Sequence, residues 1–300
     1  MSSHVFITKK YLDRCLQTGL FGVTHPQINY LANVRREDTA FFLETGSGRL
    51  VGPFTVQAPL FFSDDPIWEA SKDPFVNRVQ LTTNHQVWEA DITALWDVLL
   101  QRDSGDFLAF TTFQRSAVTL LPGEGQRLAK ILASSGNESS SLPPFTIKRH
   151  PVDLLMRDSQ TFSSEARLES CFLLARECLL DMLYREELID STDDAIIMNQ
   201  VTLPGNYDVD IVVFVQGEMV IIELKKDSIK KATIRQILRY GTYWKHSERD
   251  CRLLAIGSEI RARDKERKVG LLTYRIDRDS KTIIVTGNRG GYEFPTQFSP

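Results

Sequence analysis

An apolar stretch broken by a tight turn is the feature that most constrains the fold. Residues 207–215 and 218–225 are rich in Val, Ile and Leu, and only a Gln-Gly pair separates them. Two strands joined by so short a turn pair as antiparallel neighbours. Because successive side chains of a strand point to opposite faces, Ile222 and Leu224 are expected in the core. The stretch therefore predicts a hairpin inside a sheet.

Charged residues occupy the alternate positions of this hairpin. Glu223 and Lys225 share one face of the second strand, and antiparallel pairing can bring Asp210 of the first strand beside Glu223. Two carboxylates and an ammonium at the end of an apolar hairpin are costly to bury without a partner. Mg²⁺ suits this geometry, because one or two protein carboxylates typically hold it. We therefore predict a metal site, with Mg²⁺ or Mn²⁺ as the cofactor.

The rest of the C-terminal half alternates helix and strand signals. Ser164 fits an N-cap position, and apolar residues recur at helical spacing from Leu168 to Met182. The order of elements predicts an α/β core with a mixed sheet. A second helix is expected over residues 232–245, with further strands at 251–256, 270–275 and 282–286.

The N-terminal half predicts a small, mixed β domain with helices around it, in the form of a partly open, barrel-like sheet. Thr-Gly-Ser-Gly at residues 45–48 fits a hairpin turn, because glycine tolerates a positive φ. Strands are expected at 5–8, 39–44, 49–57 and 77–81, and helices at 10–18, 91–99 and 123–132.

A change of composition separates the two halves. Residues 133–163 contain a Ser-rich run, adjacent prolines at 143–144 and little periodicity. Segments rich in Ser, Gly and Pro bury too little surface to order themselves, so we expect a linker or a long surface loop. The predicted domains are 1–135 and 161–300, joined by a linker at 136–160.

Composition limits the classes of protein that the chain can belong to. Of its 300 residues, 42% are hydrophobic and 25% are charged, and the net charge is −3. These values are ordinary for a globular protein and exclude nucleic-acid binding through bulk positive charge, while a locally basic groove stays open. The four cysteines lie far apart without CxxC spacing, and no apolar run reaches the roughly 18 residues of a membrane span. We expect a soluble, cytoplasmic protein without a signal peptide or membrane contact.

The charged hairpin and the helix after it form an ordered series of motifs. Asp210 comes first, then Glu-Leu-Lys at 223–225, then Gln-x-x-x-Tyr at 236–240. This series resembles the PD-(D/E)XK nuclease superfamily, and it is similar to the catalytic domain of NucS-type endonucleases over roughly residues 162–256. A Glu-x-Lys pair alone is more often a solvated ion pair, so the order of the series carries the resemblance. It implies a metal-dependent endonuclease that hydrolyses phosphodiesters.

The resemblance also implies roles for single residues. Asp210 and Glu223 would hold the metal. Lys225 would orient or help to deprotonate the attacking water and would stabilise the charge that grows in the transition state. Gln236 and Tyr240, one helical turn apart, would complete the site.

An acidic residue of the preceding helix belongs to the same pattern. Glu169 is our choice and Glu165 the alternative, because the two lie four residues apart on one helix face and the sequence does not decide between them. Basic residues after the hairpin are expected to contact the DNA backbone, although such a run is also typical of a solvated helix face. They are Lys226, Lys230, Lys231, Arg235 and Arg239.

Short motifs are spread over the N-terminal half. They are Val-Phe-Ile-Thr-Lys at 5–9, Gly-Leu-Phe-Gly-Val at 19–23, Gly-Pro-Phe-Thr at 52–55, Pro-Ile-Trp at 66–68 and Pro-Phe-Val-Asn-Arg at 74–78. Together they resemble the YTH/EVE group of the PUA-like fold, over about residues 4–135 and with looser motifs than those of the nuclease half. The resemblance implies a domain that holds a modified nucleobase between aromatic side chains.

Three residues would form this base-binding site. Phe21 aligns with the first aromatic of the group and Trp68 with the second, while Phe75 follows the same loop. Phe21 departs from the Trp that is usual in methyladenosine readers, so modified cytosines stay open as ligands. Stacking on aromatic side chains suits a base that is flipped out of the helix. The alternative is that Phe21 and Trp68 belong to the core, which is the commoner position for aromatics.

The two resemblances combine into one hypothesis. A modified-base reader joined to a Mg²⁺-dependent nuclease would be a modification-dependent restriction enzyme that acts on DNA. One alternative is a mismatch-repair or structure-specific endonuclease of the NucS type. Another is a protein that binds nucleic acid, including RNA, without cutting it. Cutting of both strands by one active site per chain would favour a homodimer.

Overall fold

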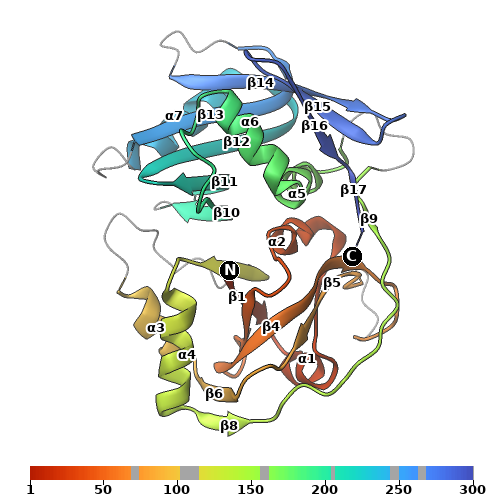
Figure 1. Ribbon diagram of the computed structural model, residues 1–300, viewed down its shortest axis with the longest axis vertical. Coiled ribbons are helices and arrows are strands. Elements are labelled where there is room, and N and C mark those ends of the chain that lie inside the picture. Colours follow the sequence, from red (N-terminus) through yellow and green to blue (C-terminus); the bar gives the residue numbers. More distant parts are fainter. Residues whose placement is uncertain are drawn as a thin grey trace. The chain divides into compact units, whose positions relative to one another are not determined.

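The computed structural model describes residues 1–68, 74–101, 115–155, 162–203, 207–243, 250–262 and 268–299. The chain forms two compact units, whose elements are labelled in Figure 1. Unit 1 is Met1–Val152 together with Ser299, and unit 2 is Asp153–Phe298. The boundary falls within the predicted linker at 136–160, of which residues 156–160 lie outside the described part.

Unit 1 is built on an eight-stranded sheet in which six strands follow the order β2-β5-β4-β3-β1-β7, while β6 pairs with β4 and β8. Among the strand pairs of the described residues, only β1–β3 is parallel. The strands are β1 (Ser3–Thr8), β2 (Leu20–Val23), β3 (Thr39–Glu44), β4 (Arg49–Phe62), β5 (Asn77–Thr82), β6 (Val87–Asp91), β7 (Ala117–Leu120) and β8 (Asn137–Ser139).

The sheet of unit 1 is open. Its terminal strands β2 and β7 do not pair with each other in the described part of the chain, so the expected barrel-like form is not a closed barrel. The predicted strands at 5–8, 39–44, 49–57 and 77–81 are confirmed, and β4 continues five residues beyond its predicted end at Gln57.

Helices of unit 1 cover the apolar side chains of this sheet. Alternate residues such as Val5 and Ile7 of β1 are buried in one cluster with Leu95 and Leu128, which come from two different helices. The helices are α1 (Leu12–Thr18), the 3₁₀ turn η1 (His25–Gln27), α2 (Asn29–Ala32), α3 (Thr93–Leu99) and α4 (Glu124–Ser135).

The segment after α4 lies against unit 1 rather than forming a loose linker up to Val152. β8 pairs with β6, and Gln80 donates its side-chain amide to the carbonyl of Phe145 at 2.7 Å. Phe145 and Ile147 also pack on the buried cluster around Phe61. Two isolated apolar residues give no periodic signal, so the Ser- and Pro-rich composition concealed this contact.

Unit 2 is a mixed sheet of seven strands in the order β10-β11-β12-β13-β14-β15-β16. The β12–β13 and β13–β14 pairs are parallel and the other four pairs are antiparallel. Both units are therefore of mixed α+β type. The strands are β10 (Ile196–Leu203), β11 (Tyr207–Val215), β12 (Glu218–Ile229), β13 (Asp250–Ile260), β14 (Val269–Asp277), β15 (Thr282–Thr286) and β16 (Gly291–Pro295), and two-residue strands are β9 (Val152–Asp153) and β17 (Gln297–Phe298).

The predicted hairpin of β11 and β12 is confirmed. Its pairing ends at Val215 and Glu218, and Gln216 and Gly217 both have positive φ, as a tight hairpin turn requires. Met219–Leu224 are all buried, and successive side chains of a strand point to opposite faces. Both faces of β12 are therefore covered, and both α5 (Glu165–Leu174) and α7 (Lys231–Tyr243) contact this strand.

The long helix expected after Ser164 is two helices. Ser164 caps α5 as predicted, because its hydroxyl accepts a hydrogen bond from the Arg167 N–H at 3.3 Å. Ala175 then leaves the helical region, with φ −91° and ψ 47°, before α6 (Arg176–Arg185) begins. The apolar periodicity continues across this break, so the sequence pattern did not reveal it.

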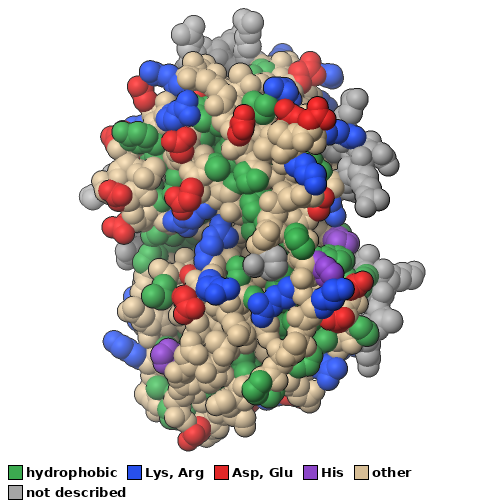
Figure 2. Space-filling model, turned by 45° about the vertical axis from the view of Figure 1, so that its right-hand side comes forward, with side chains coloured by type: hydrophobic (Ala, Val, Ile, Leu, Met, Phe, Trp, Pro, Cys, Tyr) green, Lys and Arg blue, Asp and Glu red, His purple; other side chains and the backbone are tan. Residues whose placement is uncertain are grey.

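The surface carries charges of both signs, as the small net charge of −3 suggests. Figure 2 shows acidic and basic side chains interspersed over the face drawn, without one sign dominating it. Among the described helices, none has the length and apolar character that crossing a membrane requires.

Candidate functional site

The hairpin of unit 2 places two acidic residues side by side. Ile211 pairs with Ile222, so Asp210 and Glu223 occupy the next position of the same register. The carboxylate of Asp210 accepts a hydrogen bond from the Leu224 N–H at 2.7 Å. Asp210 is thereby held against the strand that carries Glu223. The predicted proximity of the two acids is present in the structure.

Both carboxylates are held in a poorly solvated place. Burial raises the pKa of Asp210, and the attraction of Lys225 opposes this only in part. Burial and then repulsion by Asp210 raise the pKa of Glu223. Glu223 is 1% exposed, and its Oε2 has no hydrogen-bond partner among the described residues. An unpartnered buried carboxylate oxygen is costly, and a bound cation would remove that cost.

Lys225 links an acid of β12 to an acid of α5 in this cluster. Its ammonium lies 2.8 Å from Glu223 Oε1 and 3.3 Å from Glu165 Oε2. Burial lowers the pKa of Lys225, but the attraction of Glu223 and Asp210 outweighs it, so the net pKa is raised. The ammonium therefore stays charged at neutral pH and offers a fixed positive group beside the carboxylates.

Both candidate acids of α5 reach the cluster, in different ways. Glu165 forms the ion pair with Lys225 and is felt electrostatically by Asp210 and Glu223. Glu169 is buried and accepts the side-chain amide of Gln200 at 2.7 Å, and that same amide lies 3.4 Å from Asp210 Oδ1. The link from Glu169 to Asp210 thus passes through Gln200.

Gln200 is a site residue that the sequence analysis missed, because β10 was not predicted. The pairing of β10 with β11 omits Gln200 and Asp210, and Gln200 has φ 51°. A non-glycine residue in the left-handed region is strained, and such residues occur in tight turns and at functional sites. Asn199 beside it donates to Glu169 Oε1 at 3.1 Å, so two consecutive amides hold this acid. The available signal was the share of Ile, Val, Thr and other apolar residues in 196–203, which is typical of a strand.

Gln236 and Tyr240 share one face of α7, as their spacing predicts. Gln236 donates its amide to the Tyr240 hydroxyl, which in turn donates to the backbone carbonyl of Asp208 at 2.8 Å. Tyr240 is 1% exposed, and burial raises its pKa. The pair therefore attaches α7 to β11 next to Asp210.

The predicted phosphate-binding residues lie on α7 and just before it. Lys231, Arg235 and Arg239 are spaced four residues apart and are exposed, so they form a row on one helix face. Arg239 also lies over the ring of Tyr207, 4.9 Å from its centroid. Lys230 is exposed as well, and Lys226 is half-buried.

The cluster offers few metal ligands, and they are of the oxygen type that a hard cation prefers. Within the described ranges, no group of three or more His, Cys, Asp or Glu side chains is placed to hold a metal ion. Asp210 and Glu223 supply two carboxylates, and Mg²⁺ commonly takes only one or two from the protein, with water filling the other positions. The unpartnered Oε2 of Glu223 is the atom best suited to such an ion.

Unit 1 contains a cavity of about 580 Å³ whose wall includes all three predicted base-binding residues, Phe21, Trp68 and Phe75. Tyr11, which the sequence analysis did not select, is a fourth aromatic in the wall. The rings of Trp68 and Phe75 are edge-to-face at 5.6 Å, and those of Tyr11 and Phe75 at 5.8 Å. Phe21 is 4% exposed and stacks on Phe6 at 4.9 Å, so it is both a core residue and part of the wall.

The position of Trp68 is determined from several sides. A Cβ at Gly22 would lie 2.9 Å from the Trp68 ring and 3.1 Å from Phe75, so only glycine leaves room for the indole. Arg78 lies 5.3 Å from the ring centroid and donates to the Phe75 carbonyl at 2.9 Å. Arg14 donates to the carbonyl of Ile67 at 2.9 Å. These contacts hold Ile67 and Trp68 in place.

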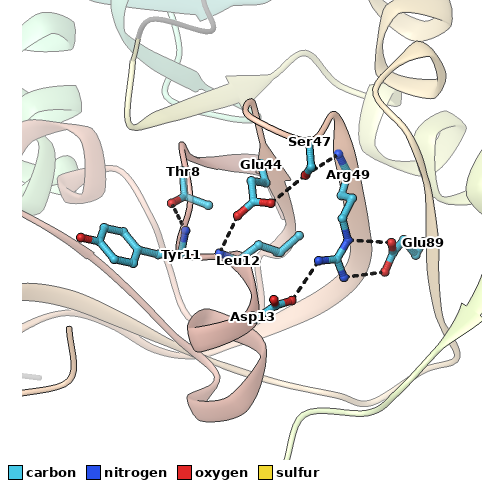
Figure 3. A network of polar contacts seen from close by, with 8 residues as sticks. All are labelled: Thr8, Tyr11, Leu12, Asp13, Glu44, Ser47, Arg49 and Glu89. Atoms are coloured by element: carbon cyan, nitrogen blue, oxygen red, sulfur yellow. Dashed lines mark hydrogen bonds and ion pairs between the residues drawn. The ribbon is translucent and has the colours of Figure 1, made fainter. Parts of the chain in front are cut away.

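Polar contacts also hold the loop that carries Tyr11 (Figure 3). The Tyr11 N–H donates to the Thr8 hydroxyl at 3.1 Å, and the Leu12 N–H donates to Glu44 at 3.2 Å. Arg49 then links Asp13 of α1 to Glu89 of β6, at 2.9 and 2.7 Å. In Figure 3 the Tyr11 ring points away from this network.

Basic side chains complete the cavity wall. Lys9, Lys10 and Arg115 line it, and no Asp or Glu is among the described residues that do so. A lining that combines aromatic rings with lysine and arginine suits a planar ring attached to phosphate groups. The sequence analysis placed the basic residues only in unit 2, because Arg115 is far along the chain from the adjacent Lys9 and Lys10.

Comparisons with known proteins give no family. No family model matches the chain, and no curated protein sequence matches it. Among solved structures, the chain is similar to the YTH domain of Mmi1 in complex with RNA, with a TM-score of 0.33 and 14% identity over 44% of this chain and 79% of that chain. It is also similar to the protein Atu2648 from Agrobacterium tumefaciens, with a TM-score of 0.31 and 14% identity over 47% of this chain and 100% of that chain. We therefore base the function on the residues of the two sites alone.

Proposed function

We propose that the chain binds nucleic acid and hydrolyses its phosphodiester bonds at the carboxylate cluster of unit 2, directed by a modified base held in the aromatic cavity of unit 1. One observation carries the proposal. Asp210 and Glu223 are adjacent, with raised pKa values and an unpartnered buried oxygen, next to the charged Lys225. A fold has no structural need for such a costly group, so its retention supports a reaction.

The cluster contains the parts that phosphodiester hydrolysis needs. Asp210 and Glu223 would hold Mg²⁺ or Mn²⁺. When bound, the ion supplies charge neutralisation at the scissile phosphate and lowers the pKa of water. Lys225 would donate a hydrogen bond to a phosphate oxygen and stabilise the negative charge that develops there.

Glu165 also contacts the Lys225 ammonium. It lies 3.3 Å from the Lys225 nitrogen, so it fixes the direction in which the remaining N–H groups of Lys225 point. Glu169 and Gln200 keep the Asp210 carboxylate in place. Glu165, Glu169 and Gln200 would therefore act as positioning residues around Asp210, Glu223 and Lys225.

The cavity of unit 1 supports recognition of a base. Rings of Phe21, Trp68 and Phe75 offer stacking surface, which is worth about 1–3 kcal/mol per base. Lys9 and Lys10 stand where phosphates of the same strand could be neutralised. A base can enter this cavity only after it leaves the double helix, so we propose that the base is flipped.

A second candidate is a protein that binds nucleic acid without cutting it. The low number of metal-ligating side chains in the described part favours this candidate, as do the two ion pairs that already engage Lys225. The nucleic acid could then be RNA as well as DNA. A repair nuclease directed by mismatches is a further form of the first candidate, and it would not need the aromatic cavity.

Cleavage assays separate these candidates. Matched DNA duplexes with plain cytosine, 5-methylcytosine, 5-hydroxymethylcytosine or N6-methyladenine are incubated with the protein, with Mg²⁺ or with EDTA. We expect Mg²⁺-dependent cutting of one modified duplex, lost in Glu223→Gln and no longer selective in Trp68→Ala. Equal cutting of all duplexes would refute the base-directed part, and cutting only at mismatches would favour repair. Binding without cutting of any DNA or RNA would favour the second candidate.

A further inference from the structure

We propose that the aromatic cavity of unit 1 accepts an uncharged modified base and excludes a base that carries a positive charge. The inference rests on the proposed base-reading function and narrows its substrate class. The question is open for any aromatic cavity, because ring faces attract cations as readily as they stack on neutral bases. The charges around this cavity decide it.

Two of the aromatic rings already face a cation that belongs to the protein. The guanidinium of Arg78 lies 5.3 Å from the centroid of the Trp68 ring, and the ammonium of Lys10 lies 5.1 Å from the centroid of the Tyr11 ring. Arg78 is buried at 3% exposure, and a hydrogen bond to the Phe75 carbonyl keeps it there. A cationic base on either ring would therefore meet a like charge at short range.

The described part of the wall offers no acid to offset this repulsion. Lys9, Lys10 and Arg115 line the cavity, without any Asp or Glu among the described lining residues. Cationic ligands are usually held in aromatic sites with help from a carboxylate, and that help is missing from this lining. The summed charge favours a neutral ring that is attached to anionic phosphates.

The nearest acids lie outside this lining. Asp65 and Asp64 attract the Arg78 guanidinium and offset part of its charge, but neither is among the described lining residues, so Lys10 is the cation that the test below addresses.

Cys15 lies in the wall, and burial raises the pKa of its thiol to about 12, so the thiol is neutral. Glu44 lies behind Cys15, and its two oxygens already accept hydrogen bonds from the Leu12 N–H and the Ser47 hydroxyl (Figure 3). These hydrogen bonds leave Glu44 charged, but they hold its oxygens at Leu12 and Ser47, which are not among the described lining residues.

Isomeric methylated bases test the inference, because the cationic member of each pair carries the same methyl group at another ring position and one additional proton. Fluorescence anisotropy at about pH 6.5 measures the binding of labelled single strands with one central N6-methyladenine or N1-methyladenine, and likewise 5-methylcytosine or 3-methylcytosine. The first member of each pair is neutral and the second is cationic. We expect the neutral member to bind at least about tenfold more tightly than the cationic one in the pair that contains the preferred base.

A charge variant separates repulsion from the changed position of the methyl group. Lys10→Gln removes the cation from the Tyr11 ring and is expected to reduce the ratio of the two affinities to below about threefold. Lys130→Gln, on the exposed face of α4, is the control and should keep the wild-type ratio. Tighter or equal binding of the cationic isomer, or a ratio that Lys10→Gln leaves unchanged, would overturn the inference. If no modified strand binds more tightly than its plain counterpart, the base-reading function itself fails.

Discussion

The cavity of unit 1 and the carboxylate cluster of unit 2 are stabilised in opposite ways. Around the cavity, ring contacts and hydrogen bonds hold Trp68 and Tyr11, so packing builds the site and stabilises the unit. In the cluster, two acids with raised pKa values lie beside each other, and Glu223 keeps an unpartnered oxygen. One site comes from favourable packing, and the other persists in spite of unfavourable electrostatics.

This difference predicts how the two units respond to substitution. Changes in the cavity should reduce binding and stability together, because the same contacts serve both. Changes that neutralise the cluster should abolish function and increase stability, because they remove a buried charge. The following experiments test this contrast from the largest expected effect to the smallest.

The largest effect is expected for Lys225→Ala. Loss of a preorganised donor to the transition state typically reduces the rate by about 10²–10³-fold. Single-turnover cleavage of the preferred duplex at saturating protein and Mg²⁺ measures this rate. Lys130→Ala, which removes an exposed lysine of unit 1, is the matched control. A Lys225→Ala rate close to that of the control would exclude a catalytic role for this residue.

Trp68→Ala should weaken binding of the modified base by roughly 5–150-fold, which corresponds to the loss of about 1–3 kcal/mol of stacking. Plain DNA should bind as before, because the indole contacts the base alone. Anisotropy with modified and plain strands gives both affinities. Trp68→Phe should restore part of the preference, and an unchanged preference in Trp68→Ala would place base recognition elsewhere.

Glu223→Gln should raise the free energy of unfolding of the metal-free protein above neutral pH by about 1–3 kcal/mol, since one pKa unit corresponds to roughly 1.4 kcal/mol. The folded state raises the pKa of Glu223, so it binds a proton that the unfolded chain has lost. The stability of the wild type therefore falls as the pH rises from the ordinary pKa of a glutamate to this raised value.

Urea denaturation in EDTA at several pH values measures this dependence. The substituted protein should show a flatter pH profile than the wild type, because Gln cannot titrate. Glu293→Gln, on the exposed side of β16, is the control and should leave the profile unchanged. Destabilisation by Glu223→Gln across the whole pH range would contradict the view that the cluster is strained by charge.

The smallest effect on binding is expected for Gly22→Ala. The new Cβ would lie 2.9 Å from the Trp68 ring, so the indole must shift by a few tenths of an ångström. We expect about fivefold weaker base binding and a loss of roughly 1–3 kcal/mol in stability. Anisotropy and near-ultraviolet circular dichroism measure both. At Gly291 a Cβ would meet only Ile284, at 3.8 Å, so Gly291→Ala should change neither quantity.

Local sequence patterns predicted the parts of the fold that depend on neighbouring residues. The bounds of β11 agree with the predicted strand at residues 207–215, because alternation of side chains and a two-residue turn leave little freedom. The same register explains why Asp210 and Glu223 could be predicted as neighbours. The α5 N-cap at Ser164 was predictable for the same local reason.

Other features depended on residues that are distant in the sequence. The break at Ala175 occurs within an unbroken apolar pattern, and Phe145 packs on unit 1 from a segment whose composition is typical of a linker. Gln200 reaches Glu169 and Asp210 only because β10 joins the sheet beside β11. None of these contacts has a local signature.

The sequence by itself determined the hairpin and its pair of acids, because strand alternation and turn length act over a few residues. Only the tertiary structure decided which helix acid contacts Lys225 and which rings and cations share the cavity. Tyr11, Trp68 and Arg115 come from separate loops, and the register of the strands between those loops brings them together. Side chains far apart along the chain meet only when the sheet fixes the distances between the loops that carry them.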